Sequence, residues 1–508
     1  MQLTYRTASK WLTVIALGSI SWITISAATI YVPDLSFASV QTAINSASDG
    51  DNINIPAGSA TWTSTLTINK AITLQGAGSS STIITNAVPS TGTLMTINLV
   101  AGKPTRLTGF QVPNTPLANT GQAAFIVSGH SDQDGSTFRV DHCVFGQQPS
   151  YCFWLTDVFG VADHNTFTAG PQHIPFEIWN ANWGGHSYGD GSWADDSYFG
   201  ASKFFFMEDN TFTCSSSTYP EALVDSLGGA RYVVRNNILM NASVINHGTE
   251  SGGRTRGGRV MEVYNNVFQG NCAFWINIRS GTAVIWGNDL KGVTQFGGVS
   301  ATILEAKRLT YSFTPWGQAN GKNLWDSNVA GGPFASGTAT GGGSLTLTDS
   351  TKNWTVNQWA GNGYVLVKTN AGSGYCGSQI VSNTSTSLTI QGNDGYATQI
   401  SFTTGNTYGI WRVNEALDQP GKGKGSLVTG STPLVPSGWF DEVTDPIYQW
   451  GNTSSDNTAN FRIKASESTI RANEHYFSVA KPGYTPYTYP HPLVTGSPNP
   501  PTNLRVQM

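Results

Sequence analysis

The sequence predicts an all-β fold: a parallel β-helix, or solenoid, that begins with a capping helix and carries a small antiparallel β-module. Three observations support this prediction. A short pattern of an apolar residue, Asn and then Phe or Leu recurs in one register, an amphipathic helical segment precedes it, and a stretch with a different β-pattern follows it. Internal repetition with a period of about 20–50 residues indicates a stacked-repeat architecture.

The repeated unit is a strand that ends at a turn. Its six copies are FRVDHCVF, GVADHNTF, FFMEDNTF, YVVRNNIL, MEVYNNVF and AVIWGNDL, with key positions Cys143, Asn165, Asn210, Asn237, Asn266 and Asn288. These positions are 22, 45, 27, 29 and 22 residues apart, and 22 residues suit one solenoid coil. Asn tolerates the left-handed conformation of a tight corner, and its amide can form local hydrogen bonds. We therefore expect the five asparagines to stack as a hydrogen-bonded ladder.

The start of the chain is expected to be a cleaved export signal, residues 1–28. Arg6 and Lys10 precede an apolar run, and Ser26 and Ala28 offer a small-residue cleavage site. We expect a monomer that is secreted, to the periplasm or outside the cell, and that is free of the membrane after cleavage. A net charge of -4 without runs of like charge argues against a nucleic-acid partner.

The rest of the chain divides into four parts. Residues 29–336 are predicted to form the β-helix, and the amphipathic helix within SFASVQTAINSASDG caps its open end. Residues 337–412 contain short β-runs between Gly and Asn turns, which predict the antiparallel module. Residues 413–494 are irregular and Pro-rich, and we expect them to pack on the β-helix or close it. Residues 495–508 are expected to be a flexible tail.

The segment SFASVQTAINSASDGDNINIPAGSATWTSTLTINKAITLQGAG resembles the N-terminal cap and first coils of secreted right-handed parallel β-helix proteins of the pectate-lyase-like superfamily. The resemblance covers roughly residues 30–300 and implies a right-handed helix. The superfamily holds lyases, hydrolases, epimerases, phage tailspikes and adhesins. The resemblance therefore implies a particular fold, but it does not imply a particular activity.

Strand alternation predicts which side chains leave the core. Two positions before the turn, the outward column begins with Asp141, Asp163 and Glu208 and continues with Arg235. Stacked carboxylates about 4.8 Å apart repel one another unless they are protonated, paired or bound to a cation. One interpretation is a Ca²⁺ site on the three acids or an acid pair for glycosidic hydrolysis. The other is a solvated surface column.

The strand upstream of each turn supplies a second outward face. One of its columns is predicted to hold Glu177 and Trp275, and the next to hold Trp179, Asp225 and Asn277. Two long insertions leave the coil beside this face, NWGGHSYGDGSWADDSYFGAS and HGTESGGRTRGGR, and long loops on a regular scaffold indicate function. Exposed rings and single polar groups suit a sugar-binding groove, although rings packed under loops would give the same pattern. The predicted substrate-binding residues are Glu177, Trp179, Trp183, Trp193, Arg254, Trp275, Asn277 and Arg279.

The second insertion gathers much charge for a chain that is 11% charged. His247 and Glu250 could act as base and acid beside Asp225, and Arg256 and Arg259 could bind carboxylate or sulfate groups. These five residues are the predicted catalytic set. The alternative is a structural salt-bridge network that holds the insertion in place.

The resemblance and the charged insertion together favour a secreted enzyme that cleaves an extracellular polysaccharide. In β-helix lyases of the superfamily, a basic side chain removes the proton α to a uronate carboxyl. Elimination on an acidic glycan is therefore expected ahead of glycoside hydrolysis. A non-catalytic glycan-binding or adhesin-type protein would need the same groove without the base and the acid.

Overall fold

The structure is a computed structural model, and it describes most of the chain beyond the expected export signal. The described residues are 27–115, 122–170, 173–214, 221–250, 253–272, 274–291, 293–294, 302–309, 311–322, 325–326, 333–370, 377–391, 400–425, 427, 442–454, 461–464, 469–495 and 503–506. Almost all of the expected export signal lies outside these residues. Within them, no helix is long and apolar enough to cross a membrane.

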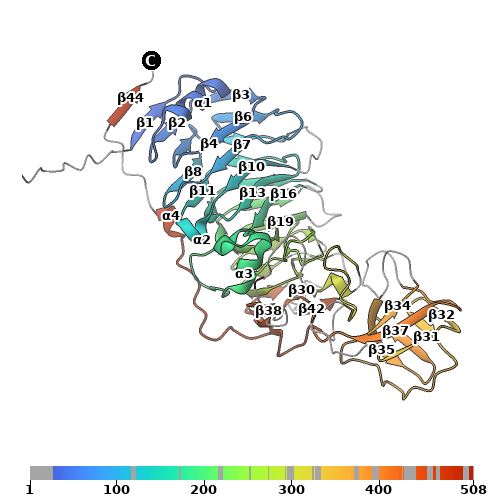
Figure 1. The fold of residues 1–508 in the computed structure, drawn as a ribbon. Coiled ribbons are helices and arrows are strands. Elements are labelled where there is room, and N and C mark those ends of the chain that lie inside the picture. The colour runs from blue at the N-terminus through green and yellow to red at the C-terminus, as the bar shows by residue number, and fades with distance from the viewer. Residues whose placement is uncertain are drawn as a thin grey trace, which may run out of the picture.

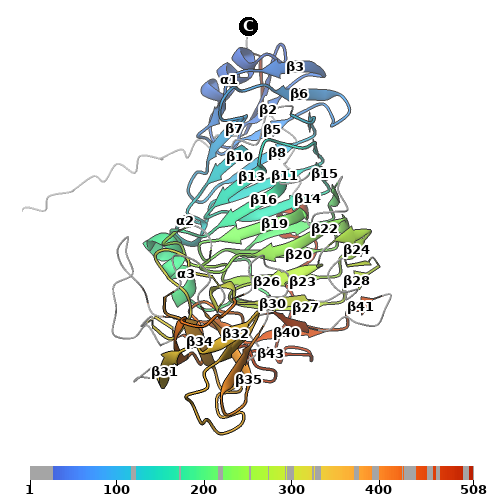
Figure 2. The same cartoon turned by 90° about the vertical axis from the view of Figure 1, so that its right-hand side faces the viewer.

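Three long parallel sheets wind into a β-helix, which Figure 1 and Figure 2 show as a stack of coils. Sheet A consists of β1 (Ala28–Tyr31), β2 (Asn52–Asn54), β5 (Thr73–Gln75), β8 (Pro104–Thr108), β11 (Thr137–Asp141), β14 (Phe159–Asp163), β17 (Phe205–Glu208), β20 (Arg231–Arg235), β23 (Val260–Tyr264), β27 (Thr282–Trp286), β40 (Ile447–Trp450), β43 (Tyr476–Phe477) and β44 (Asn503–Val506). Sheet B consists of β3 (Gly58–Trp62), β6 (Thr82–Asn86), β9 (Gln111–Val112), β12 (Val144–Phe145), β15 (Thr166–Ala169), β18 (Thr211–Cys214), β21 (Ile238–Met240), β24 (Val267–Gln269), β28 (Asp289–Leu290) and β41 (Thr453–Ser454). Sheet C consists of β4 (Leu66–Ile68), β7 (Met95–Asn98), β10 (Ala123–Ser128), β13 (Tyr151–Thr156), β16 (Ile174–Trp179), β19 (Glu221–Leu227), β22 (Ala242–Asn246), β26 (Ile276–Ile278), β30 (Thr302–Glu305) and β42 (Phe461–Lys464).

A seven-stranded antiparallel sheet forms the predicted module, drawn in orange in Figure 1. Its strands are β31 (Ala335–Thr338), β32 (Gly341–Gly343), β33 (Thr346–Thr348), β34 (Tyr364–Lys368), β35 (Gly377–Asn383), β36 (Ser387–Ile390) and β37 (Thr407–Arg412). Two short pairs join β25 (Asn271–Cys272) to β29 (Val293–Thr294) and β38 (Lys422–Gly423) to β39 (Val443–Thr444). The parallel β-helix and the small antiparallel sheet are therefore both confirmed.

The helices are short and lie at the ends and in the loops. They are α1 (Phe37–Ser46), α2 (Ser131–Asp134), α3 (Asp190–Ala194) and α4 (Pro492–Thr495), with the 3₁₀ turns η1 (Trp183–Gly185), η2 (Ser187–Gly189) and η3 (Lys307–Leu309). The hydroxyl of Ser36 caps α1 by accepting from the N–H of Ser39 at 3.3 Å. Helix α1 buries Val40, Ala43 and Ile44 against the first coils, which is the predicted capping helix.

Stacked side chains fill the interior and the turns. Inside, the rings of Phe125, Phe153 and Phe176 follow one another with centroids 4.6 and 5.4 Å apart. At the turns, the amide Oδ1 of Asn237 accepts from the N–H of Asn210 at 2.9 Å, and that of Asn266 accepts from the N–H of Asn237 at 3.0 Å. The predicted ladder is present. The left-handed residue is the one before each ladder position, such as Asn236 with φ 56°, and not the ladder Asn itself.

The segment after the module completes the solenoid, where the sequence analysis expected irregular cover. Strand β40 pairs with β27, β41 with β28, and β42 with β30, all in parallel. Asn452 extends the ladder, because its Oδ1 accepts from the N–H of Asn288 at 3.0 Å. On the outside, the rings of Tyr264, Trp286 and Trp450 stack with centroids 4.6 and 5.8 Å apart. The module is therefore an insertion between two coils.

The end of the chain also differs from the expected flexible tail. Asn503–Val506 forms β44, which pairs in parallel with β1 at the N-terminal edge of sheet A. An edge strand presents unpaired N–H and C=O groups, and β44 satisfies those of β1.

Candidate functional site

The three acids predicted to bind a metal lie on the outer face of sheet A, and each has an arginine partner. Arg106 binds both oxygens of Asp141 at 2.6 Å. Arg139 binds those of Asp163 at 2.8 and 2.9 Å. On a further coil, Nε of Arg235 lies 2.7 Å from Oε2 of Glu208. These ion pairs offset the repulsion between stacked carboxylates without a cation from solution.

The C-terminal segment covers this column, so it is not a solvated surface. The N–H of His491 donates to Oε1 of Glu208 at 2.8 Å, and Arg235 donates to the carbonyl oxygen of Tyr487 at 2.8 Å. Nδ1 of His142 lies 2.8 Å from Asp141, and the atoms of Asp141, His142 and Asp163 are close enough to share a cation. Ca²⁺ binding stays a prediction, and Glu208 does not belong to that group.

The arginines of the glycine-rich insertion lie in a buried ion network. Arg254 pairs with Asp190 of α3 at 2.6 Å. Arg256 binds Asp418 through Nε at 2.8 Å and also lies 3.3 Å from Asp190. The side chains of Arg256 and Arg259 are fully buried.

The same network reaches the chain that follows the module. Arg256 lies 2.8 Å from Glu442, and Arg259 lies 2.8 Å from Asp445. These contacts match the structural alternative, in which the arginines hold the insertion in place. Because their carboxylate partners come from the protein itself, these contacts argue against the predicted catalytic roles of Arg256 and Arg259 and the predicted substrate binding by Arg254.

Three of the predicted substrate-binding tryptophans are also buried. The ring of Trp183 lies 4.3 Å from the guanidinium of Arg231, and Nε1 of Trp193 donates to the carbonyl oxygen of Gly257 at 2.7 Å. Trp275 belongs to the solenoid core and packs against Phe268. Trp275 lies in a bend before β26, so strand alternation does not extend to it. The structure thus gives these three rings packing roles.

The register of sheet C brings Glu177 and Asp225 together. Glu177 of β16 pairs directly with Asp225 of β19, and Ile245 of β22 pairs with Asn277 of β26. Strand alternation in the sequence predicts Asp225 in the column of Trp179 instead. Strand β19 carries an irregularity between Ala222 and Val224, which repetition in the sequence does not reveal.

The acid pair is buried and has few partners. Glu177 is 2% exposed; its Oε1 accepts from Nε1 of Trp179 at 2.6 Å, and its Oε2 has no hydrogen-bond partner among the described residues. Burial, reinforced by the charge of Asp225, raises the pKa of Glu177 well above its ordinary value. Burial also raises the pKa of Asp225 to about 6, against the opposing charge of Arg279.

His247 and Arg279 complete the surroundings of Asp225. Nε2 of His247 lies 3.0 Å from Oδ2 of Asp225, and Nδ1 of His247 is buried without a hydrogen-bond partner in the described chain. Nη2 of Arg279 lies 4.0 Å from Asp225, and its Nη1 lies 3.3 Å from Oε1 of Glu250. Burial raises the pKa of Glu250 to about 7. Asn277 donates to Glu305 at 3.4 Å.

Partly exposed aromatic rings lie beside Glu177. Trp154 of β13 pairs directly with Glu177, and its ring centroid is 5.5 Å from that of Trp179. Tyr151 packs edge-on against Trp154 at 5.6 Å. Sequence reasoning kept Trp179 and missed Tyr151 and Trp154, although alternation already directed Trp154 outward.

Several other buried acids have ion-pair or hydrogen-bond partners that Glu177 lacks. Asp141, Asp163 and Asp418 are each bound by an arginine through two atoms or more. Glu262 lacks a cation, but both of its oxygens accept hydrogen bonds, from Gly200 at 2.7 Å and from Tyr484 at 2.6 Å. Among the described residues, Glu177 has no close cation and a hydrogen bond on one oxygen only, and a buried carboxyl with so few partners is a candidate functional group.

Comparisons with known proteins identify no family. No family model and no curated protein matches the chain. Among solved structures, ORF18 of Geobacillus virus E2 is 15% identical over 79% of this chain and 75% of that chain, with a TM-score of 0.32. The catalytic domain of a GH87 alpha-1,3-glucanase variant in complex with nigerose is 9% identical over 55% of this chain and 58% of that chain, with a TM-score of 0.27. At these values the likenesses do not bear on the activity.

Proposed function

We propose that the protein is a secreted carbohydrate-active enzyme that hydrolyses glycosidic bonds, with Glu177 and Asp225 as its two carboxyl groups. The observation that carries the proposal is the direct pairing of these acids on neighbouring strands, each with a raised pKa and neither with a close arginine partner. Glycoside hydrolysis requires such a pair in two protonation states.

The environments of the two acids favour different roles. Burial and the charge of Asp225 raise the pKa of Glu177 well above its ordinary value, which favours the protonated form and the role of general acid towards the leaving oxygen. Asp225 ionises above a pH of about 6 and attacks the anomeric carbon. Neighbouring strands lie about 4.8 Å apart. This spacing is closer to the ~5–5.5 Å between carboxyl groups of retaining enzymes than to the ~6.5–9.5 Å of inverting ones.

The partners of Arg279 favour hydrolysis over elimination. A lyase needs a cation that neutralises the carboxylate of its substrate. The Nε of Arg279 donates to the carbonyl oxygen of Asn246 at 2.8 Å, its Nη1 faces Glu250, and its side chain is 7% exposed. Arg256 and Arg259 are occupied as well. The partly exposed rings of Trp154 and Trp179 offer apolar faces to a sugar ring next to the acids.

The test is a panel of polysaccharides assayed both for new reducing ends and for the ultraviolet absorbance of an unsaturated product. We expect reducing ends without unsaturated product. Glu177→Gln should reduce turnover by about 10²- to 10⁴-fold at an unchanged melting temperature. Glu262→Gln is the matched control, because it makes the same change at a buried acid on sheet A. An unsaturated product, or full activity of folded Glu177→Gln, would contradict the proposal.

A further inference from the structure

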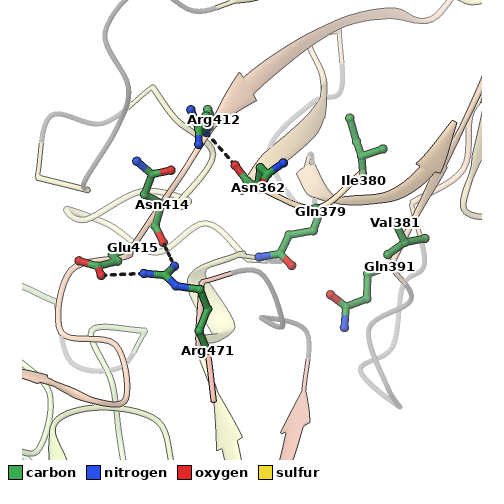
Figure 3. A pocket seen from close by; sticks show the side chains of 10 residues that line it. Asn362, Gln379, Ile380, Val381, Gln391, Arg412, Asn414, Glu415 and Arg471 are labelled. Carbon is green, nitrogen blue, oxygen red and sulfur yellow. Dashed lines mark hydrogen bonds and ion pairs between the residues drawn. The ribbon is translucent and has the colours of Figure 1, made fainter. Parts of the chain in front are cut away.

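A cavity of about 770 Å³ lies between the antiparallel module and the C-terminal segment (Figure 3). The module contributes Gln379 from β35, Gln391 after β36, and Arg412 from the end of β37. The opposite wall contains Glu415 and Arg471, which Figure 3 shows across the cavity from the two glutamines. None of the residues of the acid pair lines it, so this cavity is a second, separate feature.

Its size and lining are those of a binding site for a small polar molecule. Ligand sites commonly have volumes of about 300–1,000 Å³ and occur where two structural units meet. Most of the lining side chains are amides, arginines or a carboxylate, with Ile380 and Val381 as the aliphatic part. No aromatic side chain is among these lining residues, which makes a stacked nucleobase an unsuitable occupant.

The charge on the C-terminal wall is balanced within the protein. Arg471 binds both oxygens of Glu474, at 2.6 and 2.7 Å, and lies 3.2 Å from Glu415. Burial opposes the ionisation of Glu415, but His475 and Lys422 outweigh it and lower its pKa to about 2. This wall therefore has no cation left for a ligand.

Arg412 differs from Arg471. Its Nε donates to the carbonyl oxygen of Asn362 at 2.7 Å, and its guanidinium lies 5.6 Å from the ring centre of Tyr364. No carboxylate of the described residues forms an ion pair with it. Its two terminal nitrogens thus keep their N–H groups for a planar anion, and a carboxylate matches the guanidinium fork.

The side chain of Gln391 adds a hydrogen-bond acceptor to the lining of the cavity. Its Oε1 is buried and has no hydrogen-bond partner among the described residues. A hydroxyl group of a ligand would supply the missing donor. The neighbouring amides of Asn362 and Asn414 can bind further hydroxyls.

We infer that this cavity binds a carboxylate-bearing sugar, with the carboxylate on the terminal nitrogens of Arg412 and hydroxyls on the neighbouring amides of Asn362 and Asn414 (Figure 3). This binding site goes beyond the proposed hydrolysis and does not depend on it. A uronate combines the required planar anion with several hydroxyls in a volume that the cavity accommodates.

The experiment is isothermal titration calorimetry of the full protein with D-galacturonate and D-glucuronate, and with D-galactose and D-glucose as the neutral counterparts. A uronate should bind at least about tenfold more tightly than its neutral counterpart, because a charge-assisted pair discriminates by this factor or more. Arg412→Gln should remove that preference, and Arg412→Lys should keep part of it. Lys368→Gln is the matched control, because it removes one positive charge from the same module outside the cavity lining.

Several results would overturn the inference. These are no binding of either uronate, equal affinity for charged and neutral sugars, and wild-type affinity in Arg412→Gln. Loss of uronate binding in Glu177→Gln, with Arg412→Gln unaffected, would place the sugar at the acid pair instead. Uronate binding by an inactive Glu177→Gln variant supports the cavity whatever becomes of the proposed hydrolysis.

Discussion

At the scale of single residues, the partner of a buried acid decides its chemistry. Asp163 and Asp225 both lie on outer faces of the solenoid and both are buried. Arg139 binds Asp163 through two atoms and keeps it as part of an ion pair. Asp225 has His247 at 3.0 Å and an arginine only at 4.0 Å, so burial raises its pKa. The first arrangement holds the carboxylate in an ion pair, and the second leaves a buried carboxyl with a raised pKa.

The loss of activity at low pH should reflect the protonation of Asp225. Because the pKa of Asp225 is about 6, activity should fall as the pH drops below that value and the carboxylate is protonated. The charge of Arg279 lowers this pKa, so Arg279→Gln should move the acid limb to higher pH. The measurement is kcat/KM against pH for both proteins, with melting temperatures as a check on folding. If the acid limb of the Arg279→Gln profile stays at the wild-type pH, the charge of Arg279 does not lower the pKa of Asp225.

The dependence of stability on pH should reflect the ionisation of Glu262. Burial raises its pKa to about 7 from an ordinary 4.5, so the folded state binds the proton more tightly than the unfolded state. Its stabilising contribution is therefore complete below a pH of about 4.5 and is lost as the pH rises through about 7. Glu262→Gln cannot ionise, and its melting temperature should fall less steeply between those values. Parallel curves for the two proteins would contradict this assignment.

At the scale of elements, the ladder was predictable and the register of sheet C was not. An Asn at each turn is a local signal, and Trp450-Gly451-Asn452 even repeats Trp286-Gly287-Asn288 in the coil that the sequence analysis missed. The register that pairs Glu177 with Asp225 is not encoded by any repeat in the sequence, and β19 is irregular in its pairing with β22.

The acids that pair with the arginines of the insertion could not be predicted from the sequence either. Arg256 and Asp418 are separated by 162 residues, so their contact exists only after the solenoid has closed behind the module. The charged insertion was located correctly, but its arginines were assigned to substrate because their acids could not be placed. The cavity at Arg412 was missed for the same reason, since its walls come from two distant segments.

The ladder can be tested with Asn237→Leu. Nδ2 of Asn237 donates to the carbonyl oxygens of Met207 and Arg235 at 2.9 Å, and its Oδ1 accepts from the N–H of Asn210. Leucine leaves these groups unpaired in a buried place, so the free energy of unfolding should fall by about 3 kcal/mol or more. Chemical denaturation measures it. Asn69→Leu, at an exposed position, should change it by less than about 0.5 kcal/mol. Equal losses at both positions would mean that the ladder adds no stability.

At the scale of the whole molecule, the module is inserted into the solenoid and shares a wall with it. Its first and last strands, β31 and β37, pair with each other, so the chain leaves close to where it enters. Strand β34 alternates between two cores. Leu366 faces the module's own cluster, whereas Val365 and Val367 belong to the cluster of the solenoid interior. An insertion attached only by a linker would leave these two valines exposed.

This shared wall predicts a single cooperative unfolding transition for the solenoid and the module. Val367→Ala removes two methyl groups from a fully buried side chain, and it should lower the single melting temperature by roughly 2 °C. Differential scanning calorimetry measures the transition, and limited proteolysis sampled along the same temperatures shows whether the module is cut before the solenoid. Val356→Ala, in the same module but 66% exposed, should leave the curve unchanged. Two separate transitions, or a module that is digested while the solenoid persists, would show that β34 does not couple the two cores. A single transition that moves with Val367 would mean that the cavity walls at Arg412 and Arg471 are held together until the solenoid itself unfolds.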